Sequence, residues 1–565
     1  MNSLSKPPEP LPPIDFSIPR PELLTLENGL VVHYCKTKRV PAVNLHLTFN
    51  FGELDDPPEL FGLSSAMAAM MSEGTENFSS REIAEKIERL GADLSIRATT
   101  DFFIISARSL SIYFNDLLDL LEEVIFRPTF PEDELDLYKR NTIEHLKFQR
   151  SQPSFLATER ALSALYGNHP LGRFSPTAEE IMRIDRSKLS EWHKKKLLET
   201  DASLLVVGDI EKQELISALN DRFASWQRDS GSQAQAPLLP AEPQRTLYLV
   251  DRPASSQANI IIANRSANRT SQDYFAILVM NQILGAGASS RVFMNLREEK
   301  GYTYGAYTRF DMKRTSGEFE ATTEVRNEVV GAALSELDFE LSRIRTEQVK
   351  PEELADAKAY LKGVFPIRAE TQEGLTGLIA NKIIYGLPDE WLYNYRQLVD
   401  RVSLEDVTAA AQKYIKPENA AIVVVGDGEV IFQQVSGFAA NLIAFDQNGQ
   451  EISTEKFQQQ EPENFAGKWQ LSAEFQGQTV PISLSLNQTG SSVTGALETA
   501  LGSGVISTAT VNGCRIRANA SATLAGQQIE FTISGELQGE DFVGQIVSEM
   551  FPQSLGFKGR RETDS

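Results

Sequence analysis

The amino-acid sequence predicts an α+β protein built from two homologous α/β-sandwich halves and a small C-terminal all-β barrel or sandwich. Three observations support this prediction. The chain of 565 residues is too long to fold around one hydrophobic core. Several landmarks of its first half recur in its second half at nearly one spacing. After about residue 465 the pattern changes to strand alternation with many glycines.

The recurring landmarks indicate an internal duplication. They are LLVVGD ending at Asp209 and IVVVGD ending at Asp427, 218 positions apart; Pro131 and Pro351, 220 positions apart; and Tyr166 and Tyr385, 219 positions apart. Similarity at a fixed spacing marks a repeated structural unit. We therefore expect two halves, at 23–227 and 245–440, that face each other across a cavity.

Apolar periodicity predicts the elements of the first half. Alternation predicts strands at 30–35, 43–52, 94–99, 103–108 and 204–210. The first two strands are expected to pair with each other. Helical spacing predicts helices at 63–71, about 80–90, 115–125, 131–149 and 154–166, and one that ends at Trp226. The second helix has clear ends, because Ser79 and Glu82 have capping-box spacing and Gly91 follows the last apolar residue.

Two glycines of the second half, Gly285 and Gly287, precede the stretch on which the functional prediction depends. Glycine tolerates backbone angles that a side chain forbids. We therefore expect the helix at 274–284 to stop here and the chain to reverse. A serine, Ser289 or Ser290, can then cap a new helix.

The new helix has an apolar stripe and is expected to end at Gly301. Beyond it, Tyr302, Tyr304 and Ala306 occupy alternate positions, as in a strand. Arg297 would then leave the last helical turn close to Tyr304. A guanidinium and a phenol both donate hydrogen bonds, so this pair suits a substrate carbonyl or a developing oxyanion. The alternative is that Arg297 pairs with a neighbouring glutamate and Tyr304 is a half-buried sheet residue.

The composition excludes several classes of function. A net charge of −22 argues against nucleic acid and anionic membrane as partners. The two cysteines, Cys35 and Cys514, lie far apart, so neither a disulfide framework nor a cysteine metal cluster is available. None of the five histidines lies within one helical turn of another. The sequence lacks a stretch of about 18 apolar residues, so no membrane span is expected.

The remaining segments are interpreted from their composition. Residues 1–22 read as a proline-rich tether without a secretory leader. The default expectation is therefore a cytoplasmic protein, or a periplasmic one if a leader has been removed. Linkers are expected at 228–244 and 441–464. The β domain at 465–565 has no cluster of histidine, cysteine or carboxylate residues, which favours an accessory role.

The duplicated halves and three motifs together resemble the pitrilysin-type metallopeptidases, also called inverzincins. The motifs are GLSSAMAAMMSEGT at 62–75, YGNHPLGR at 166–173 and RVFMNLREEKGYTYGAY at 291–307. The resemblance covers about residues 20–440. It is closest to the members with paired subunits, such as mitochondrial processing peptidase and its bacterial heterodimeric counterparts.

This resemblance places a zinc motif where the sequence lacks its ligands. In the family, His-x-x-Glu-His supplies two zinc ligands from one helical face and a glutamate that activates water. Here the three positions are Ser65, Ala68 and Ala69. The family's third ligand, a glutamate on a later helix, corresponds to about Glu144, with His145 beside it. The motif helix is therefore interpreted as a packing helix, and no metal is expected in this chain.

The family also uses an arginine and a tyrosine of the second half to hold the substrate and stabilise the tetrahedral intermediate. These two match Arg297 and Tyr304. The resemblance thus implies a non-catalytic subunit of a heterodimeric zinc metallopeptidase, with peptide substrates and with zinc in a homologous partner chain. One alternative is a catalytically inert structural or peptide-binding homologue. A stand-alone metallopeptidase is a third reading, and it lacks the ligands it would need.

Overall fold

The computed structural model describes residues 16–226, 237–458, 460–475, 478–500, 502–524, 527–548 and 554–562. These residues divide into two compact units, one containing both α/β halves and the other containing the C-terminal β domain. Residues 1–15 of the predicted tether and 228–236 of the predicted linker lie outside the described residues.

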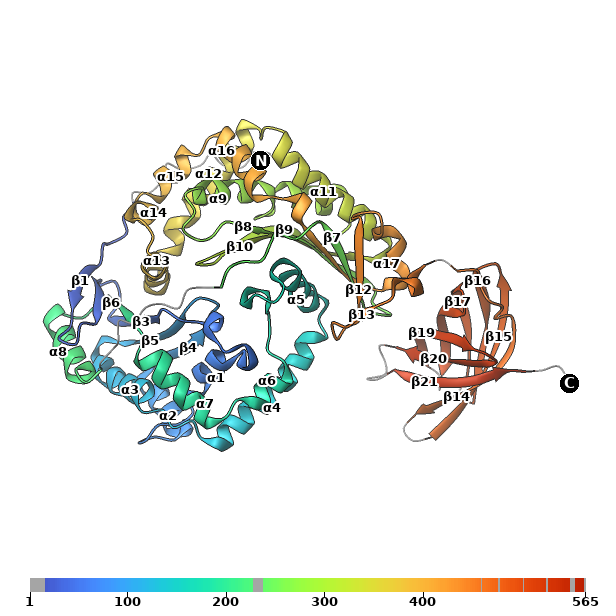
Figure 1. Ribbon diagram of the computed structural model, residues 1–565, viewed down its shortest axis with the longest axis horizontal. Coiled ribbons are helices and arrows are strands. Elements are labelled where there is room, and N and C mark those ends of the chain that lie inside the picture. The colour runs from blue at the N-terminus through green and yellow to red at the C-terminus, as the bar shows by residue number, and fades with distance from the viewer. Residues whose placement is uncertain are drawn as a thin grey trace, which may run out of the picture. The chain divides into compact units, whose positions relative to one another are not determined.

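The first half folds around a six-stranded sheet with the strand order β1-β2-β6-β3-β5-β4 (Figure 1). Its strands are β1 (Glu22–Thr25), β2 (Val31–Lys36), β3 (Ala42–Phe49), β4 (Asp93–Ala98), β5 (Phe103–Leu110) and β6 (Ala202–Gly208). Its longer helices are α1 (Leu63–Met70), α2 (Ser80–Leu90), α3 (Phe114–Phe126), α4 (Glu132–Arg150), α5 (Pro153–Tyr166) and α8 (Lys212–Phe223). Shorter helical segments are α6 (Ala178–Arg183), α7 (Arg186–Trp192) and the π-helix η5 (His193–Leu198).

The predicted pairing of the strands at 30–35 and 43–52 is wrong, because β6 lies between β2 and β3. Leu204 of β6 stands opposite Val32 on one side and Leu47 on the other. The apolar run of β6 is typical of a central strand buried on both faces. Its partners, however, lie more than a hundred residues earlier in the chain, so no local pattern indicates where it inserts.

The second half folds around a seven-stranded sheet with the order β13-β12-β7-β11-β8-β10-β9. Its strands are β7 (Thr246–Asp251), β8 (Gln257–Ser266), β9 (Ala306–Met312), β10 (Gly317–Arg326), β11 (Ala421–Gly426), β12 (Asn441–Phe445) and β13 (Glu451–Ile452). Its longer helices are α9 (Tyr274–Leu284), α11 (Val330–Thr346), α12 (Pro351–Arg368), α13 (Gln372–Ile384) and α16 (Leu404–Tyr414). Helix α17 (Gly428–Val435) follows β11, and most of its residues belong to the unit of the C-terminal β domain. Shorter helical segments are α10 (Arg291–Phe293), the π-helix η6 (Met294–Glu299), α14 (Asp389–Tyr393) and α15 (Tyr395–Arg401).

The strand orders of the two sheets confirm the predicted duplication. The run β7-β11-β8-β10-β9 repeats the run β2-β6-β3-β5-β4 of the first half. Only the outer edge differs, since β1 pairs antiparallel with β2 whereas β12 pairs parallel with β7. The segment 441–464, predicted as a linker, thus contributes β12 and β13 to the second sheet. The short apolar run at 441–445 becomes a strand because it pairs with β7, which lies almost 200 residues earlier in the chain.

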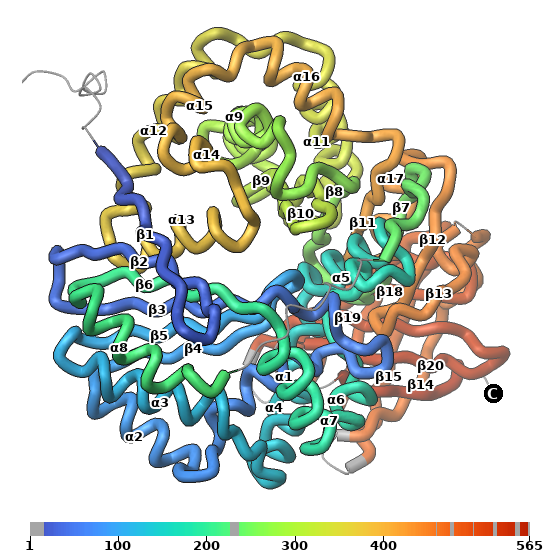
Figure 2. Tube along the Cα trace, turned by 60° about the vertical axis from the view of Figure 1, so that its left-hand side comes forward, coloured from blue at the N-terminus to red at the C-terminus, as the bar shows by residue number. Residues whose placement is uncertain are grey.

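Each half contributes one helix to the sheet of the other half. Helix α5 packs on β8 and β11, with Ala157 and Ala161 fully buried. Helix α13 packs on β3 and β6, with Ile379 fully buried. Figure 2 shows α5 beside β11 and α13 beside β6. Because separation would expose an apolar face on both sheets, the exchange joins the two halves into one unit.

The tyrosine landmarks of the sequence lie at the ends of these exchanged helices. Tyr166, the last residue of α5, donates a hydrogen bond from its hydroxyl to Glu318 Oε2 of the second half at 3.0 Å. Tyr385, which follows α13, packs edge-on against Phe102 of the first half, with ring centroids 5.1 Å apart. The repeated Tyr-Gly therefore marks the point where each half reaches into the other.

The C-terminal unit is an antiparallel barrel, which resolves the predicted choice between a barrel and a sandwich. The barrel strands, in order, are β14 (Gly467–Phe475), β15 (Gln478–Thr489), β16 (Ser492–Thr499), β17 (Gly502–Asn512), β18 (Arg515–Leu524), β19 (Gln527–Gln538), β20 (Asp541–Val547) and β21 (Leu555–Arg561). Its core contains Phe465, Trp469 and Phe542, whose rings contact one another. Gly513, with φ of 56°, lies in the turn between β17 and β18. Throughout the described residues, every helix is too short or too polar to serve as a membrane span.

Candidate functional site

Helix α1 carries the three positions that correspond to the zinc motif. Ser65 donates a hydrogen bond from Oγ to Glu53 Oε1 at 2.6 Å. Ala68 is 3% exposed and packs in the core of the first half. Ala69 is half-buried and has no polar side-chain atom. The three positions therefore offer one hydroxyl, already engaged by a carboxylate, in place of two imidazoles.

A second carboxylate holds the beginning of α1. Asp56 Oδ1 accepts from the backbone N of Ser64 at 3.0 Å and from Ser64 Oγ at 2.5 Å, and its Oδ2 accepts from the backbone N of Gly62 at 2.9 Å. Burial raises the pKa of Asp56 to about 7, although these hydrogen bonds act in the opposite direction. Burial likewise raises the pKa of Glu53, against the hydrogen bond from Ser65. This polar network orients the helix, which is a structural role.

The residues of this region do not fit a zinc ion. Glu144, the expected third ligand, is exposed on α4 and pairs with Lys147 at 2.7 Å. His169 accepts from the backbone N of Leu171 through Nδ1 at 3.1 Å, which supports a structural role. Among the described residues, no three histidine, cysteine, aspartate or glutamate side chains are grouped so that they could hold a metal ion. Zinc needs about four such donors, and the part of the chain that the structure describes does not bring such a set together.

The second candidate region, α10 with η6, is held by two polar contacts with later helices. Arg291, 8% exposed, forms a bidentate pair with Glu353 of α12: Nε lies 2.7 Å from Oε1 and Nη2 lies 2.8 Å from Oε2. Arg291 holds the pKa of Glu353 below its ordinary value. Asn295 donates to Glu336 Oε2 and to Glu340 Oε1 of α11, each at 3.0 Å. Motif reasoning missed these residues, because their partners lie 41 to 62 positions downstream.

Arg297 lies on the exposed side of η6. Its guanidinium carbon is 4.8 Å from the centroid of the Phe293 ring. Its Nε is 3.5 Å from Glu298 Oε1, and the two side chains are 46% and 50% exposed. An exposed pair of this kind contributes at most about 1 kcal/mol. The predicted pairing with a neighbouring glutamate is therefore present, and it leaves the guanidinium accessible to a ligand.

Tyr304 lies outside the sheet, contrary to the strand predicted from Tyr302 onward. Strand β9 begins only at Ala306, and Tyr304 is 90% exposed. The prediction of a half-buried sheet tyrosine is therefore wrong. The alternation of residue types from Tyr302 onward was a poor guide here. Such alternation indicates which side chains share a face, but it does not show whether the backbone has a strand partner.

A threonine shapes the segment that carries Tyr304. The backbone N of Gly305 donates to Thr303 Oγ1 at 3.1 Å. The same hydroxyl lies 2.7 Å from the carbonyl oxygen of Glu324 on β10. Because the hydroxyl binds backbone groups that a strand ladder would otherwise use, it replaces strand pairing at this point. Tyr304 is thus displayed from an anchored segment.

Gly285 ends α9 for a reason other than the one predicted. Its φ is −160°, extended backbone that any residue adopts. A Cβ at this position would lie 2.3 Å from Thr308 Oγ1, and the backbone N of Thr308 donates to Gly285 O at 3.0 Å. Close approach of β9 therefore requires the glycine. Gly301, with φ of 63°, does adopt the left-handed conformation at the predicted end of the helix.

Two family models match the chain. The model described as "Insulinase (Peptidase family M16)" matches residues 31–176, which include Ser65, Ala68 and Ala69. The model described as "Peptidase M16 inactive domain" matches residues 183–361, which include Arg297 and Tyr304.

Curated relatives cover most of the same region. The chain is 23% identical over 408 residues to "Uncharacterized zinc protease YmxG" of Bacillus subtilis (strain 168), covering 72% of this chain and 98% of the relative. It is 22% identical over 402 residues to "Non-peptidase homolog YmxG" of Helicobacter pylori (strain ATCC 700392 / 26695), covering 70% of this chain and 91% of the relative. Relatives at similar distance thus bear opposite descriptions of activity.

Solved structures agree with the fold. A peptidase M16 inactive domain from Pseudomonas fluorescens superposes with a TM-score of 0.66 at 26% identity, covering 72% of this chain and 98% of that one. A protease from Helicobacter pylori superposes with a TM-score of 0.67 at 18% identity, covering 72% of this chain and 100% of that one.

Proposed function

Because the chain belongs to the M16 family of pitrilysin- and insulinase-type peptidases and their homologues, we propose that it is the non-catalytic subunit of a heterodimeric zinc peptidase. In this proposal a homologous partner chain holds the zinc. The present chain contributes Arg297 and Tyr304 to the bound peptide.

The contrast between the two candidate regions supports this proposal. At the zinc-motif positions the chain has Ser65, Ala68 and Ala69, which are not zinc ligands. In the second half, Tyr304 is 90% exposed, and the exposed Arg297 is engaged by the weak pair with Glu298 and by its contact with the Phe293 ring. A protein that served only as a scaffold would have no use for an outward arginine on an anchored helical segment and an outward tyrosine on the anchored connection that follows it.

The proposed chemistry is electrostatic. When a peptide carbonyl is attacked, its oxygen acquires negative charge, and donors placed at that oxygen lower the barrier. The Tyr304 hydroxyl is one such donor. The planar guanidinium of Arg297 can bind a carbonyl or carboxylate of the substrate through two parallel hydrogen bonds. Neither residue binds metal in this proposal.

Peptide cleavage by the reconstituted pair tests the proposal. The partner to co-purify is a homologue from the same organism that carries His-x-x-Glu-His. Tyr304→Phe removes one donor and should reduce turnover by about 10²- to 10³-fold, or roughly 3 to 4 kcal/mol. Arg297→Lys keeps the charge but loses the planar fork, so substrate binding should weaken. The matched control is Tyr307→Phe, at a half-exposed tyrosine of β9, which should keep turnover within about twofold.

Zinc content and assembly complete the test. The isolated chain should bind less than stoichiometric zinc and should not cleave peptides, while the pair should elute as one complex. Unchanged turnover in both Tyr304→Phe and Arg297→Lys, with intact assembly, would contradict the proposal. That result would favour an inert peptide-binding or structural homologue, and the Helicobacter pylori relative is likewise described as a non-peptidase homolog.

A further inference from the structure

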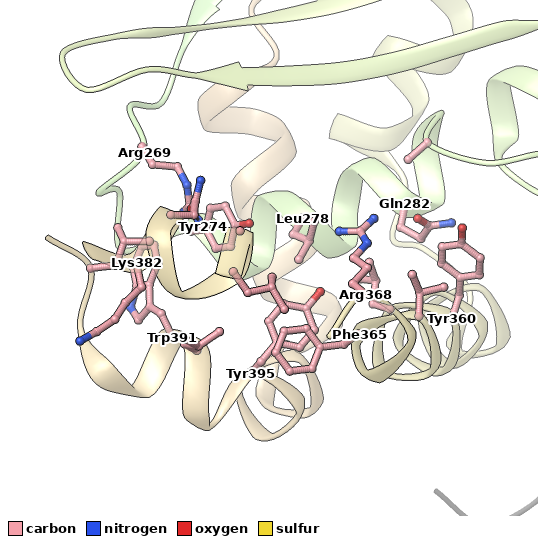
Figure 3. A pocket seen from close by; sticks show the side chains of 18 residues that line it. Arg269, Tyr274, Leu278, Gln282, Tyr360, Phe365, Arg368, Lys382, Trp391 and Tyr395 are labelled. Carbon is pink, nitrogen blue, oxygen red and sulfur yellow. The ribbon is translucent and has the colours of Figure 1, made fainter. Parts of the chain in front are cut away.

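A pocket of about 480 Å³ lies in the second half, and none of its lining residues belongs to α1 or to the segment 291–307. It is enclosed by α9, α12, α13, α14 and α15, and Figure 3 shows the side chains that line it. Two pairs of stacked rings form its apolar walls. Tyr274 and Trp391 lie with centroids 5.1 Å apart, and Phe365 and Tyr395 lie 4.1 Å apart. This volume falls in the range of about 300 to 1,000 Å³ found for small-molecule sites.

The pocket is positive although the chain as a whole carries a net charge of −22. Its charged lining residues are Arg269, Arg368 and Lys382, and none of the described lining residues is acidic. Lys382 is neutralised by an ion pair with Asp389, and Figure 3 shows its amino group pointing away from the other labelled side chains. Arg269 donates to Asn381 Oδ1 at 2.9 Å and lies over the Tyr274 ring.

Arg368 is the cation best placed for a ligand. Across the described residues it forms no ion pair, and Figure 3 shows its guanidinium on the same side of the pocket as the Gln282 amide. Gln282 also lines the pocket, and its side-chain amide forms no hydrogen bond with another described residue. A guanidinium without an ion pair and an amide without a hydrogen bond within the protein can both donate to a ligand, so the site suits a ligand with polar oxygen atoms.

We propose that this pocket binds an organic carboxylate that carries an aromatic ring. The carboxylate lies between Arg368 and Gln282, where it accepts charge-assisted hydrogen bonds. The ring packs against the stacked walls formed by Phe365 and Tyr395 and by Tyr274 and Trp391. The proposal is independent of the peptidase assignment, because the pocket shares no residue with the segment 291–307.

Calorimetric titration of the full chain tests this proposal with named probes. Indole-3-acetate supplies both the ring and the carboxylate, indole supplies the ring alone, and tryptamine supplies the ring with a positive charge. Indole-3-acetate should bind at least tenfold more tightly than the other two. Arg368→Gln should weaken its binding by about tenfold or more, since hydrogen bonds to charged groups are the strong ones. Arg401→Gln, at an exposed arginine of α15 outside the pocket, should leave binding within twofold.

Two glycines provide a second, independent variant pair. A Cβ at Gly377, which lines the pocket, or at Gly363, which does not, would meet no atom within 4 Å. Gly377→Leu should therefore fill the pocket and abolish binding without lowering the melting temperature, while Gly363→Leu should preserve binding. Replacing a helical glycine also improves helix propensity in both variants.

Peptide probes show whether the carboxylate belongs to a peptide C-terminus or to a small aromatic acid. A tetrapeptide ending in phenylalanine with a free carboxyl group, compared with its C-terminal amide, reports capture of a peptide end. Binding of the free-acid peptide assigns the pocket to peptide C-termini, and binding of indole-3-acetate alone assigns it to small aromatic acids. Equal binding of indole and indole-3-acetate, equal effects of Arg368→Gln and Arg401→Gln, or no binding of any acid at millimolar concentration would overturn the proposal.

Discussion

The two halves of the protein connect a helix to an edge strand in different ways. In the first half, α2 is followed by Gly91 with φ of 55°, and β4 begins at Asp93. In the second half, η6 is followed by Gly301 with φ of 63°, and β9 begins only at Ala306. The additional residues lie outside the sheet, where a connection can lengthen without disturbing the core. They include Tyr304, so the longer connection of the second half presents an outward donor that the shorter connection of the first half has no room for.

The helices that precede these connections are also held differently. Helix α2 is capped by its own residues, since Ser79 and Glu82 form a capping box, and only Ile83 of its side chains is fully buried. The region of α10 and η6 is instead held by Arg291 and Asn295, which bind α11 and α12. The first helix is therefore stabilised locally. The region of α10 and η6 is positioned by tertiary contacts, which would hold the Arg297 side chain in a fixed place for a substrate.

Breaking the buried ion pair of the second half should have the largest effect on stability. Arg291→Met leaves the Glu353 carboxylate without its partner, so the free energy of unfolding should fall by roughly 3 kcal/mol in urea titrations. The matched control is Arg297→Met, which removes the exposed pair with Glu298. This variant should change the free energy of unfolding by less than about 1 kcal/mol. Equal losses in the two variants would mean that the buried pair does not position η6.

Removing the local cap of the first half should have a smaller effect. Ser79→Ala deletes the oxygen that accepts from the backbone N of Glu82, and should lower the free energy of unfolding by about 1 kcal/mol. Ser290→Ala is the corresponding change in the second half. Ser290 occupies the N-cap position of α10 but makes no capping hydrogen bond, so this variant should be close to neutral. A larger loss for Ser290→Ala than for Ser79→Ala would reverse the comparison.

Loosening the segment that carries Tyr304 should reduce activity more than stability. Thr303→Val removes the hydroxyl that binds Gly305 and Glu324, and one such hydrogen bond contributes about 0.5 to 1.5 kcal/mol. In the reconstituted pair this corresponds to a two- to tenfold lower turnover. Thr303→Ser keeps the hydroxyl and should restore the parent rate. A failure of serine to rescue would indicate that packing of the threonine methyl, rather than its hydrogen bonds, matters.

The last prediction concerns the pH dependence of stability in the first half. Burial raises the pKa of Asp56 to about 7, above its ordinary value of 3.8, so folding favours the protonated carboxyl. Its contribution to stability is complete below about pH 4 and is lost as the pH rises through about 7. Asp56→Asn removes this titration. Melting temperatures from pH 4 to 8 should therefore fall less steeply in the variant than in the parent, whatever the constant offset between them, and parallel curves would contradict the assignment.

Elements with strong local chemistry were predictable from the sequence. The ends of α2 follow from the capping box at Ser79 and from Gly91, because these interactions involve residues three or four positions apart. The duplication follows from landmarks that recur at one spacing, and the matching strand orders bear it out. The absence of zinc ligands at Ser65, Ala68 and Ala69 likewise needs only the identity of the side chains.

Features that depend on distant partners were decided by the tertiary structure. Strand β6 inserts between β2 and β3, and α5 and α13 cover the sheets of the opposite halves. Tyr304 stands free of the sheet because Thr303 finds the carbonyl of Glu324 on the adjacent strand. The physical reason is common to these cases. Backbone hydrogen bonds and apolar faces must all be satisfied, and the groups that satisfy them come from parts of the chain that only folding brings together.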